Sequence, residues 1–453
     1  MSSRASIAAT RFGIGLSPGH QAPNGAAALL GELAGPDHAA ARFPVAPLAD
    51  RLAAAARHRA LSDGQAMGMG DASAMLRAAN RDLRAHNLHE QGLCLARAAF
   101  GPQGFRERLA LFWANHFATR ATENRLAGLS IAHADGAIRP HLAGDFATLL
   151  RAAVLHPAML HYLDQHRSAG PNSRAGRDRR MGLNENLGRE LLELHTLGAD
   201  GSYTQQDVRE MALLLTGASL ALPEGFVFDP DLAEPGPRRL LGRRYGGAQP
   251  DPGALLAALD DLAHHPDTAR HVTRKLARHF LGPEPVPELE SHLAAVFLQQ
   301  RGALVPVYAA LLEHPAAWAP ERRAVRPPFD FIAAALRALD PPPEAVTALG
   351  PREFVAYVDG PLRLMGQPFH EPPGPAGFPD TPAHWISPPG LAARIQWAMA
   401  IPRVLAGQPD PRDFVTAALG DLADPETVMA ARAAETRWEG VGLVLAAPAF
   451  HRR

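Results

Sequence analysis

The stretch NENLGRELLELHTLG, residues 184–198, concentrates the most chemically capable side chains of the sequence. Its leucine spacing predicts a helix, and two carboxylates, Glu190 and Glu193, lie three positions apart on it. Side chains at positions i and i+3 project from the same side of a helix, where Asn186 also lies. Two carboxylates and an amide that converge in this way can hold a divalent metal or transfer a proton.

The leucines of this helix form one apolar stripe, and polar groups flank the stripe on both sides. Arg189 lies on the carboxylate side and forms an i,i+4 pair with Glu193. His195 lies beyond the leucines, so it cannot share an ion with Glu193. The alternative interpretation is structural, because buried carboxylates are nearly always paired with arginines or with loop amides.

A second motif, FWANHF, spans residues 112–117. At helical spacing His116 shares a stripe with Phe105, Leu109 and Phe112, so its ring is expected to point into the core, with Asn115 beside it. A lone histidine on an apolar face is commonly a hydrogen-bonded core residue. Together with a carboxylate-bearing helix, however, an imidazole completes the groups that a borderline divalent metal or a proton-transfer site requires.

We therefore hypothesise a buried polar site in which His116, Glu190 and Glu193 bind a divalent metal or act as catalytic acid and base. The sequence indicates neither which metal nor which substrate. Residues around such a site orient its ligands through hydrogen bonds. We expect this role for Asn115, Asn186, Arg189 and His195.

The third motif, HVTRKLARHF at residues 271–280, carries a basic stripe. Arg274, Lys275 and Arg278 lie on one side of the predicted helix, opposite its apolar residues. Such a stripe could bind a phosphate, sulfate or carboxylate group. The more ordinary interpretation is a solvated basic face.

A fourth motif, HNLHE, places His86, His89 and Glu90 at spacings that metal ligands use. With 21 histidines in the chain, clusters of this kind also arise by chance. We rank it below the other three motifs.

The elements that position these residues are predicted to be helices, because alanine, leucine and arginine recur at helical spacing and alternating strand patterns are scarce. We expect a mostly α fold, a bundle-like array of many helices with Pro/Gly-rich loops and at most a short β-hairpin. The chain divides into five regions: an N-terminal helical region, 1–100; a core helical region with the main motifs, 101–217; an irregular excursion, 218–252; a helical region with the basic stripe, 253–338; and a Pro-rich loop with C-terminal helices, 339–453.

Composition narrows the function classes. The net charge of -1 over 453 residues gives no general attraction to nucleic acid or to an anionic membrane. Cys94 is the only cysteine, which excludes an internal disulfide and thiolate-based zinc sites. No apolar run has the length of a membrane span or of a signal peptide, so we expect a soluble protein with the cytoplasm as the default compartment.

Several familiar catalytic patterns are missing from the sequence. GIGLSPG lacks the GxGxxG spacing, the single lysine follows no glycine-rich loop, and neither HExxH nor GxSxG occurs. The sequence therefore lacks the motifs that usually indicate nucleotide binding of the Rossmann or P-loop kind, zinc-dependent proteolysis or α/β-hydrolase chemistry.

The ordered set of motifs resembles the bacterial family known as domain of unknown function 1800. RFGIG, FWANHF, HPAMLHYLD, the NENLGRELLELHTLG helix with its continuation, HHPDTARHVTRKLARHF and MGQPFHEPPGPAGF carry the resemblance over nearly the whole chain. The family implies a mostly helical fold. It also implies a sulfatase-like partner, since members are often encoded beside such a protein. Many of those sulfatase-like proteins carry export signals, so export of this chain together with its partner stays open.

One position departs from the pattern that the family leads us to expect. Many members would have a histidine before an acid in the excursion, where this chain has Ala233 before Glu234. If that histidine is a metal ligand elsewhere, a metal site in this chain lacks one ligand.

Two hypotheses from different classes follow. The first is a metal-dependent or acid–base enzyme, a hydrolase or an oxidoreductase, with the His116, Glu190 and Glu193 site. The second is a non-enzymatic assembly or maturation partner of the sulfatase-like protein, in which the same polar residues only cross-link helices.

Overall fold

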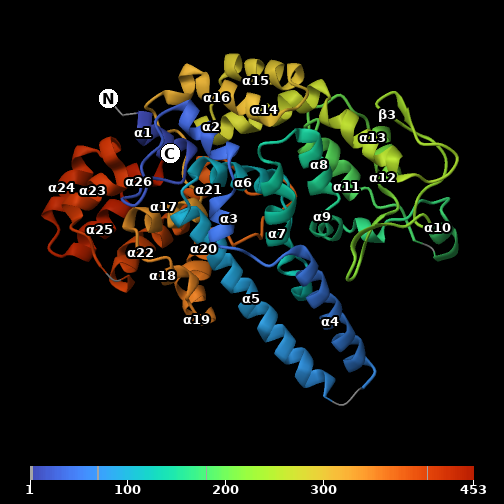
Figure 1. The fold of residues 1–453 in the computed structure, drawn as a ribbon, viewed down its shortest axis with the longest axis horizontal. Helices are drawn as coiled ribbons and strands as arrows, with labels where there is room; N and C mark the ends of the chain where they lie inside the picture. The colour runs from blue at the N-terminus through green and yellow to red at the C-terminus, as the bar shows by residue number, and fades with distance from the viewer. Residues whose placement is uncertain (1–3, 69–70, 180, 406) are drawn as a thin grey trace.

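The computed structural model describes residues 4–68, 71–179, 181–405 and 407–453. Helices dominate these residues, which confirms the expected mostly α fold (Figure 1). Two antiparallel hairpins lie in the 218–252 excursion, where the sequence predicted irregular chain with at most one hairpin. They consist of β1 (Ala218–Ala221) with β2 (Gly225–Phe228) and β3 (Arg238–Leu240) with β4 (Arg243–Tyr245).

Proline sets the start of many helices. Pro157, Pro266 and Pro328, for example, each occupy the first turn of a helix. Proline is favoured there because its fixed φ suits the helix and its missing N–H would have no partner in the first turn. The high proline content is therefore compatible with a helical protein.

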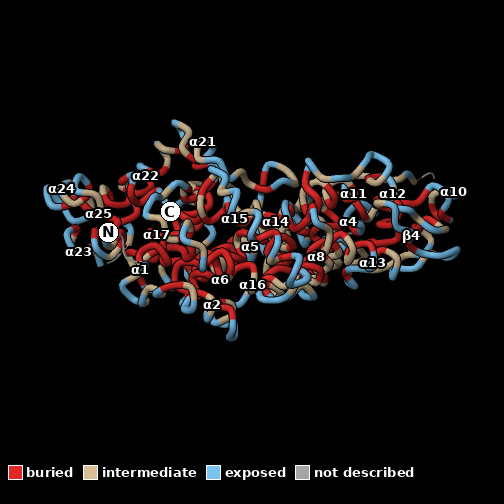
Figure 2. The backbone as a smooth tube through the Cα atoms, turned by 90° about the horizontal axis from the view of Figure 1, so that it is seen from above, coloured by how far each residue is buried: buried red, intermediate tan, exposed pale blue. Residues whose placement is uncertain are grey.

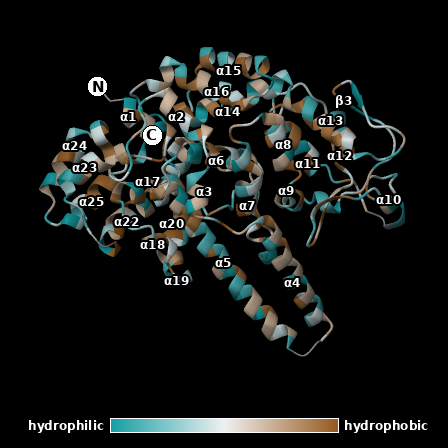
Figure 3. Ribbon diagram, in the orientation of Figure 1, coloured by the Kyte–Doolittle hydropathy of each residue, from teal (hydrophilic) through white to brown (hydrophobic). Residues whose placement is uncertain are grey.

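The N-terminal region contributes a long helical hairpin that projects from the body, which we call the arm (Figure 1). Its two helices are the longest in this region and pack against each other. Hydrophilic and hydrophobic residues are mixed along both of them (Figure 3). The helices are α1 (Arg4–Ile7), α2 (Ala26–Ala34), α3 (His38–Arg42) and the arm helices α4 (Leu48–Ala66) and α5 (Ala72–Phe100).

The middle of the chain forms one side of a flattened body, in which buried chain runs through the interior (Figure 2). Short π-helical segments extend two of its helices, η3 (His133–Ile138) after α7 and η6 (Leu191–His195) after α11; another, η1 (Ala8–Phe12), extends α1 in the N-terminal region. The α-helices are α6 (Gly104–His116), α7 (Leu129–Ala132), α8 (Phe146–Val154), α9 (Pro157–Tyr162), α10 (Arg174–Arg179), α11 (Asn186–Glu190), α12 (Gln205–Leu215), α13 (Pro252–Ala263), α14 (Pro266–Leu281), α15 (Pro287–Gln299) and α16 (Leu304–Glu313).

The C-terminal part forms the other side of the body (Figure 1). An irregular segment, residues 367–381, connects its two halves and carries most of the Pro-rich loop. The helices are α17 (Pro328–Leu339), α18 (Glu344–Thr347), α19 (Pro351–Phe354), α20 (Gly360–Leu364), α21 (Pro382–Trp385), α22 (Pro388–Val404), α23 (Pro411–Leu419), α24 (Pro425–Ala433), α25 (Arg437–Ala446) and α26 (Pro448–His451), with π-helical η8 (Val355–Asp359) between α19 and α20.

The apolar residues form two large cores. One includes α6, α8, α12, α14 and α16, and the other includes the C-terminal half of α5 together with α17 and α22–α26. Helix α6 contacts α5, so the two cores meet at these helices. Among the residues that the structure describes, no helix combines the length and apolar character needed to cross a membrane.

Candidate functional site

The helix that carries Glu190 and Glu193 changes its winding between them. Helix α11 ends at Glu190, and residues 191–195 continue as the π-helix η6. Both carboxylates are half-buried, and burial followed by the charge of Glu193 raises the pKa of Glu190. Within the described residues, neither carboxylate makes a hydrogen bond or an ion pair.

The residues expected around Glu190 and Glu193 have partners of their own. Arg189 hydrogen-bonds Gln205 at 3.1 Å and lies 3.5 Å from the carboxylate of Glu185. Asn186 is exposed, and its backbone N–H donates to the side chain of Asn184 at 2.9 Å. These contacts fix the start of α11. None of them involves the carboxylate of Glu190 or of Glu193.

His116 and His195 are both buried and bind each other's backbone. The Nε2 of His116 donates to the carbonyl of His195 at 3.2 Å, and the Nδ1 of His195 donates to the carbonyl of His116 at 3.1 Å. His271 on α14 adds a third ring, and its Nε2 donates to the carbonyl of Leu194 at 2.9 Å. The ends of α6 and η6 are thereby tied to each other and to α14.

These imidazoles are neutral at neutral pH. Burial, followed by the charge of Lys275, lowers the pKa of His195 to about 3 and that of His271 to about 4, and it places the pKa of His116 well below 6.5. The same burial lowers the pKa of Lys275 to about 8, against the raising effect of Asp380. The cluster is therefore a set of neutral rings around one cationic lysine.

The structure thus does not join the two halves of the hypothesised site. The charges and rings around His116 are Lys275, His195, His271 and aromatic side chains, whereas Glu190 interacts with Glu193 and Arg189. In the described parts of the chain, no three or more His, Cys, Asp or Glu side chains are grouped so that they could hold a metal ion. A metal or proton-transfer role for His116, Glu190 and Glu193 stays a prediction.

The unpaired carboxylates lead to a stability prediction. Because the pKa of Glu190 is raised, the folded state holds its proton more tightly than the unfolded state, and stability falls as pH rises through that raised pKa. We expect Glu193→Gln to remove the like-charge repulsion and to raise the free energy of unfolding at pH 7 by about 0.3–0.5 kcal/mol.

Urea unfolding at pH 7 and under acidic conditions, where the gain should disappear, measures this effect. The matched control is Glu185→Gln, which removes the partner of Arg189 and Arg209 and should shift stability in the opposite direction. A loss of stability in the Glu193 variant at pH 7 would show that an unrecognised group depends on this carboxylate.

The basic stripe on α14 is divided among three environments. Arg274 bonds Asp200 at 3.2 Å, and Arg278 lies 4.0 Å from Glu290. Lys275 makes no hydrogen bond or ion pair to any described residue and interacts over a longer distance with Asp380. Of these three described residues, only Lys275 therefore lacks a salt bridge. That the three residues bind an anion stays a prediction.

A cavity of about 150 Å³, the central cavity, lies where the two cores meet. Its walls come from α5, α6, η3, α14 and α17, and the segment 367–385 supplies the remaining side. The apolar part of the lining includes Ala98, Ala110, Leu111, Ile131, Phe329 and Trp385. An apolar cavity of roughly this size can hold a ring as large as benzene.

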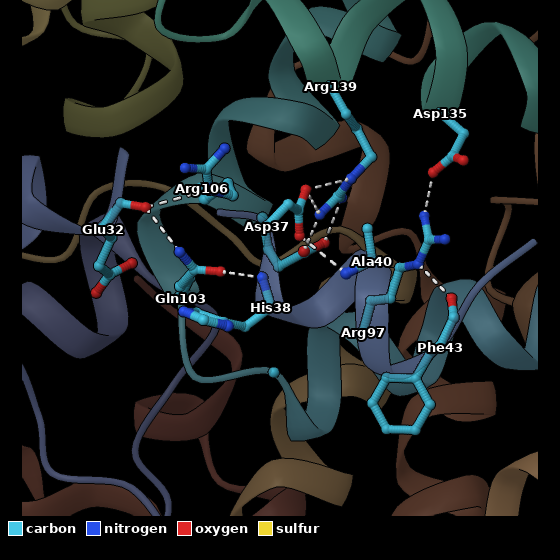
Figure 4. A network of polar contacts seen from close by, with 12 residues as sticks. Glu32, Asp37, His38, Ala40, Phe43, Arg97, Gln103, Arg106, Asp135 and Arg139 are labelled. Atoms are coloured by element: carbon cyan, nitrogen blue, oxygen red, sulfur yellow. Dashed lines mark hydrogen bonds and ion pairs between the residues drawn. The ribbon is translucent and has the colours of Figure 1, made fainter. Parts of the chain in front are cut away.

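Ion pairs form much of the polar wall (Figure 4). Arg139 bonds Glu107 at 2.6 Å and Asp37 at 2.7 Å, and Arg97 bonds Asp135. A fourth pair, Arg108 with Asp330, adds side chains from α6 and α17 to this wall. Each arginine on this wall therefore has a carboxylate partner.

Asn115 of the FWANHF motif fixes the loop that covers the cavity. Its side-chain oxygen accepts from the backbone N–H of Phe378 at 2.7 Å, and its amide donates to the carbonyl of Phe378 at 3.0 Å. The preceding residue, Gly377, has φ +82° and lies close to Asn115. A Cβ on residue 377 would be 2.6 Å from the side-chain oxygen of Asn115. A side chain from α6 thus binds the loop as a neighbouring strand would.

Asp380 and His279 lie next to each other in the lining. The Nδ1 of His279 is 4.0 Å from the carboxylate of Asp380, whose side chain is 44% exposed, while His279 is buried. Burial raises the pKa of Asp380, and burial places the pKa of His279 well below 6.5. The Nε2 of His279 is buried with no hydrogen-bond partner among the described residues.

Comparison of the chain with models of known protein families identifies one family. A family model described as "Protein of unknown function (DUF1800)" matches residues 7–452, nearly the whole chain. The chain belongs to the DUF1800 family. Neither the curated proteins nor the solved structures contain a match to it.

The acid that follows the position departing from the expected DUF1800 pattern has a structural role in this chain. The carboxylate of Glu234 accepts from the backbone N–H of Asn172 at 2.8 Å and from the Asn172 amide at 2.6 Å. Ala233 beside it is buried. Glu234 therefore holds the 170–172 loop against the excursion.

Sequence reasoning missed two residues of the central cavity in this DUF1800 chain. His279 lies within the HVTRKLARHF motif, where the basic stripe is the stronger pattern. Asp380 follows the Pro-rich motif in a region without periodicity. One sequence feature could have indicated Asp380. It is an acid directly after the loop GPAGFP, whereas the other motifs of the chain lie on predicted helices.

Proposed function

We propose that the protein binds a small, largely apolar molecule in the central cavity and accepts a proton from it, or returns one, through Asp380 with His279 beside it. The single observation that carries the proposal is Asp380 itself. It is a carboxylate without a hydrogen bond to any described residue, at the edge of an apolar cavity, 4.0 Å from a neutral imidazole.

The charges around the cavity support this role for Asp380. The wall arginines Arg97, Arg108 and Arg139 are paired with carboxylates, so they leave little charge to hold Asp380 in its ionised form. Although 44% of its side chain is exposed, the chain packed around the carboxylate desolvates it and raises its pKa, which makes it a stronger base than an ordinary aspartate. Acid–base residues commonly have pKa values shifted toward the working pH in this way.

The neighbouring residues supply orientation and charge compensation. His279 is neutral, so one ring nitrogen carries a hydrogen that can be donated and the other a lone pair. Lys275 and Arg453 interact with Asp380 and lower its pKa in opposition to burial. An anion formed when the bound molecule loses its proton would be attracted by these two cations.

The probe that tests both binding and proton transfer is 4-nitrophenol, an apolar ring with an acidic hydroxyl whose anion is yellow. At a pH where the free compound is still the phenol, binding to the wild-type protein should produce phenolate absorption. The signal should fade as pH falls through the raised pKa of Asp380, because the protonated carboxyl cannot accept the proton.

Asp380→Asn should abolish the phenolate signal and leave the circular dichroism spectrum unchanged. The matched control is Glu371→Gln, which removes another acid of the same loop that does not line the central cavity. If Asp380→Asn keeps the full signal, the proposal is wrong, and the alternative of a non-enzymatic partner for a sulfatase-like protein becomes the better account.

This proposal keeps the acid–base chemistry expected from the sequence and assigns it to other residues. His116 and Asn115 belong to the helix that forms one cavity wall, and Asn115 lines the cavity. Glu190 and Glu193 do not line it. Which reaction the proton transfer serves depends on the natural ligand.

A further inference from the structure

A second site lies in the arm, separate from the central cavity. A groove of about 620 Å³ runs between α4 and α5 and is closed at its base by residues 124–129. It shares no lining residue with the central cavity. Much of its lining is apolar, including Ala54, Leu61, Ala79, Leu83, Leu126 and Leu129.

The HNLHE motif supplies the polar end of this groove. Glu90 is 1% exposed, and its Oε1 accepts from the backbone N–H of Ala46 at 2.7 Å and from Arg51 at 2.7 Å, with His86 at 3.3 Å. Its other oxygen, Oε2, is buried and has no hydrogen-bond partner in the described chain. His89, the remaining residue of the motif, is exposed and does not line the groove.

Two more unpartnered acceptors lie in the same lining. The Oδ1 of Asn87 is buried without a partner one helical turn before Glu90. His58 on α4 contacts Asn80 through Nε2 at 3.0 Å, which makes its buried and unpartnered Nδ1 an acceptor when Nε2 donates. Buried acceptors without donors are costly, so a site that keeps three of them is suited to a ligand that donates.

The charge of the groove indicates that the donating group is neutral. The acids Asp50, Asp82 and Glu90 are matched in number by the arginines Arg51, Arg57 and Arg125. Glu90 is already paired with Arg51. A hydroxyl can donate its hydrogen to these acceptors without adding charge to the groove.

We propose that the arm groove binds a neutral amphiphile, with its apolar body between α4 and α5 and a hydroxyl group whose single hydrogen is shared between the Oε2 of Glu90 and the Oδ1 of Asn87. This site goes beyond the acid–base function proposed for the central cavity and does not depend on it.

The test compares 1-decanol with decyl methyl ether, which keeps the apolar chain and lacks the donor, by ligand-observed nuclear magnetic resonance on the full chain. Decylammonium serves as the charged comparison. Wild type should bind 1-decanol roughly tenfold or more tightly than the ether, since a hydrogen bond to a charged acceptor is lost with the ether. Equal binding of alcohol and ether, no binding of either, or tighter binding of decylammonium would each overturn the proposal.

Two variants locate the site. Glu90→Gln keeps an oxygen for Ala46 and Arg51 and places an NH₂ where Oε2 was, so the alcohol should lose roughly tenfold in affinity and the ether should gain. Asn87→Leu removes the second acceptor and should weaken the alcohol roughly three- to tenfold, which keeps the test decisive if the first variant fails to fold. His89→Ala is the control and should leave the affinity for 1-decanol unchanged. If Asn87→Leu also leaves that affinity unchanged, the alcohol binds elsewhere and the proposal is wrong.

Discussion

Replacing Asp330 with asparagine is expected to lower the free energy of unfolding by about 3–5 kcal/mol, the cost of leaving a buried charge without its partner. Asp330 lies on α17 with its side chain 5% exposed, and it bonds Arg108 of α6, whose side chain is 1% exposed. It also interacts with three other arginines that are buried around it: Arg326, Arg394 and Arg453.

The size of the effect follows from this concentration of positive charge. Arg108 also donates to the carbonyl of Gly13, but a backbone oxygen carries no full charge with which to offset a guanidinium. The amide introduced by Asp330→Asn is uncharged as well, so the arginines would repel one another in a region from which water is excluded.

Urea unfolding measures the loss, and Asp135→Asn is the control. Asp135 also forms an ion pair at the central cavity, with Arg97, but its side chain is 30% exposed and it serves one arginine. We expect that variant to lose roughly 1 kcal/mol. Equal losses in the two variants would show that the arginine cluster does not depend on Asp330.

The second large effect is expected for Gly377→Ala, with a loss of about 2–3 kcal/mol in stability from strain and steric conflict. Gly377 has φ +82°, which alanine adopts only at a cost, and the added Cβ would lie 2.6 Å from the Asn115 side-chain oxygen. The conflict can be relieved only if residues 377–378 move away from α6, which breaks the two hydrogen bonds between Asn115 and Phe378.

Because Asp380 follows this clamp, the same variant should also weaken 4-nitrophenol binding in the central cavity. Amide hydrogen exchange should show faster exchange at residues 377–381. Gly374→Ala is the matched control in the same loop, since a Cβ there would meet nothing within 4 Å. If both variants behave alike, the clamp does not position Asp380.

The sequence was sufficient for the local features of the fold. Helical periodicity predicted the mostly α architecture, and the stripe through Phe112 predicted the buried ring of His116. Each of these rests on residues within a few positions of one another, where the 3.6-residue repeat determines which side chains meet.

The candidate site depended on features that local spacing does not encode. The expected sides of the helix assumed 3.6 residues per turn through His195. Residues 191–195 instead wind as a π-helix, so the sides expected for Glu193 and His195 do not hold. The clamp between Asn115 and Phe378 joins positions 263 residues apart. The environment of Asp380 arises from an irregular loop, in which no repeat relates one residue to the next.

The solitary lysine makes this chain unusually suited to site-directed chemistry. Lys275 is the only lysine in the sequence, is partly exposed, and has a pKa lowered to about 8. An amine-reactive fluorophore would therefore find one side-chain amine, which is unprotonated in appreciable amount under mildly alkaline conditions. A fluorophore attached to Lys275 would lie one helical turn from His279 and near the charge of Asp380. We expect its emission to change when a ligand binds in the neighbouring central cavity or leaves it.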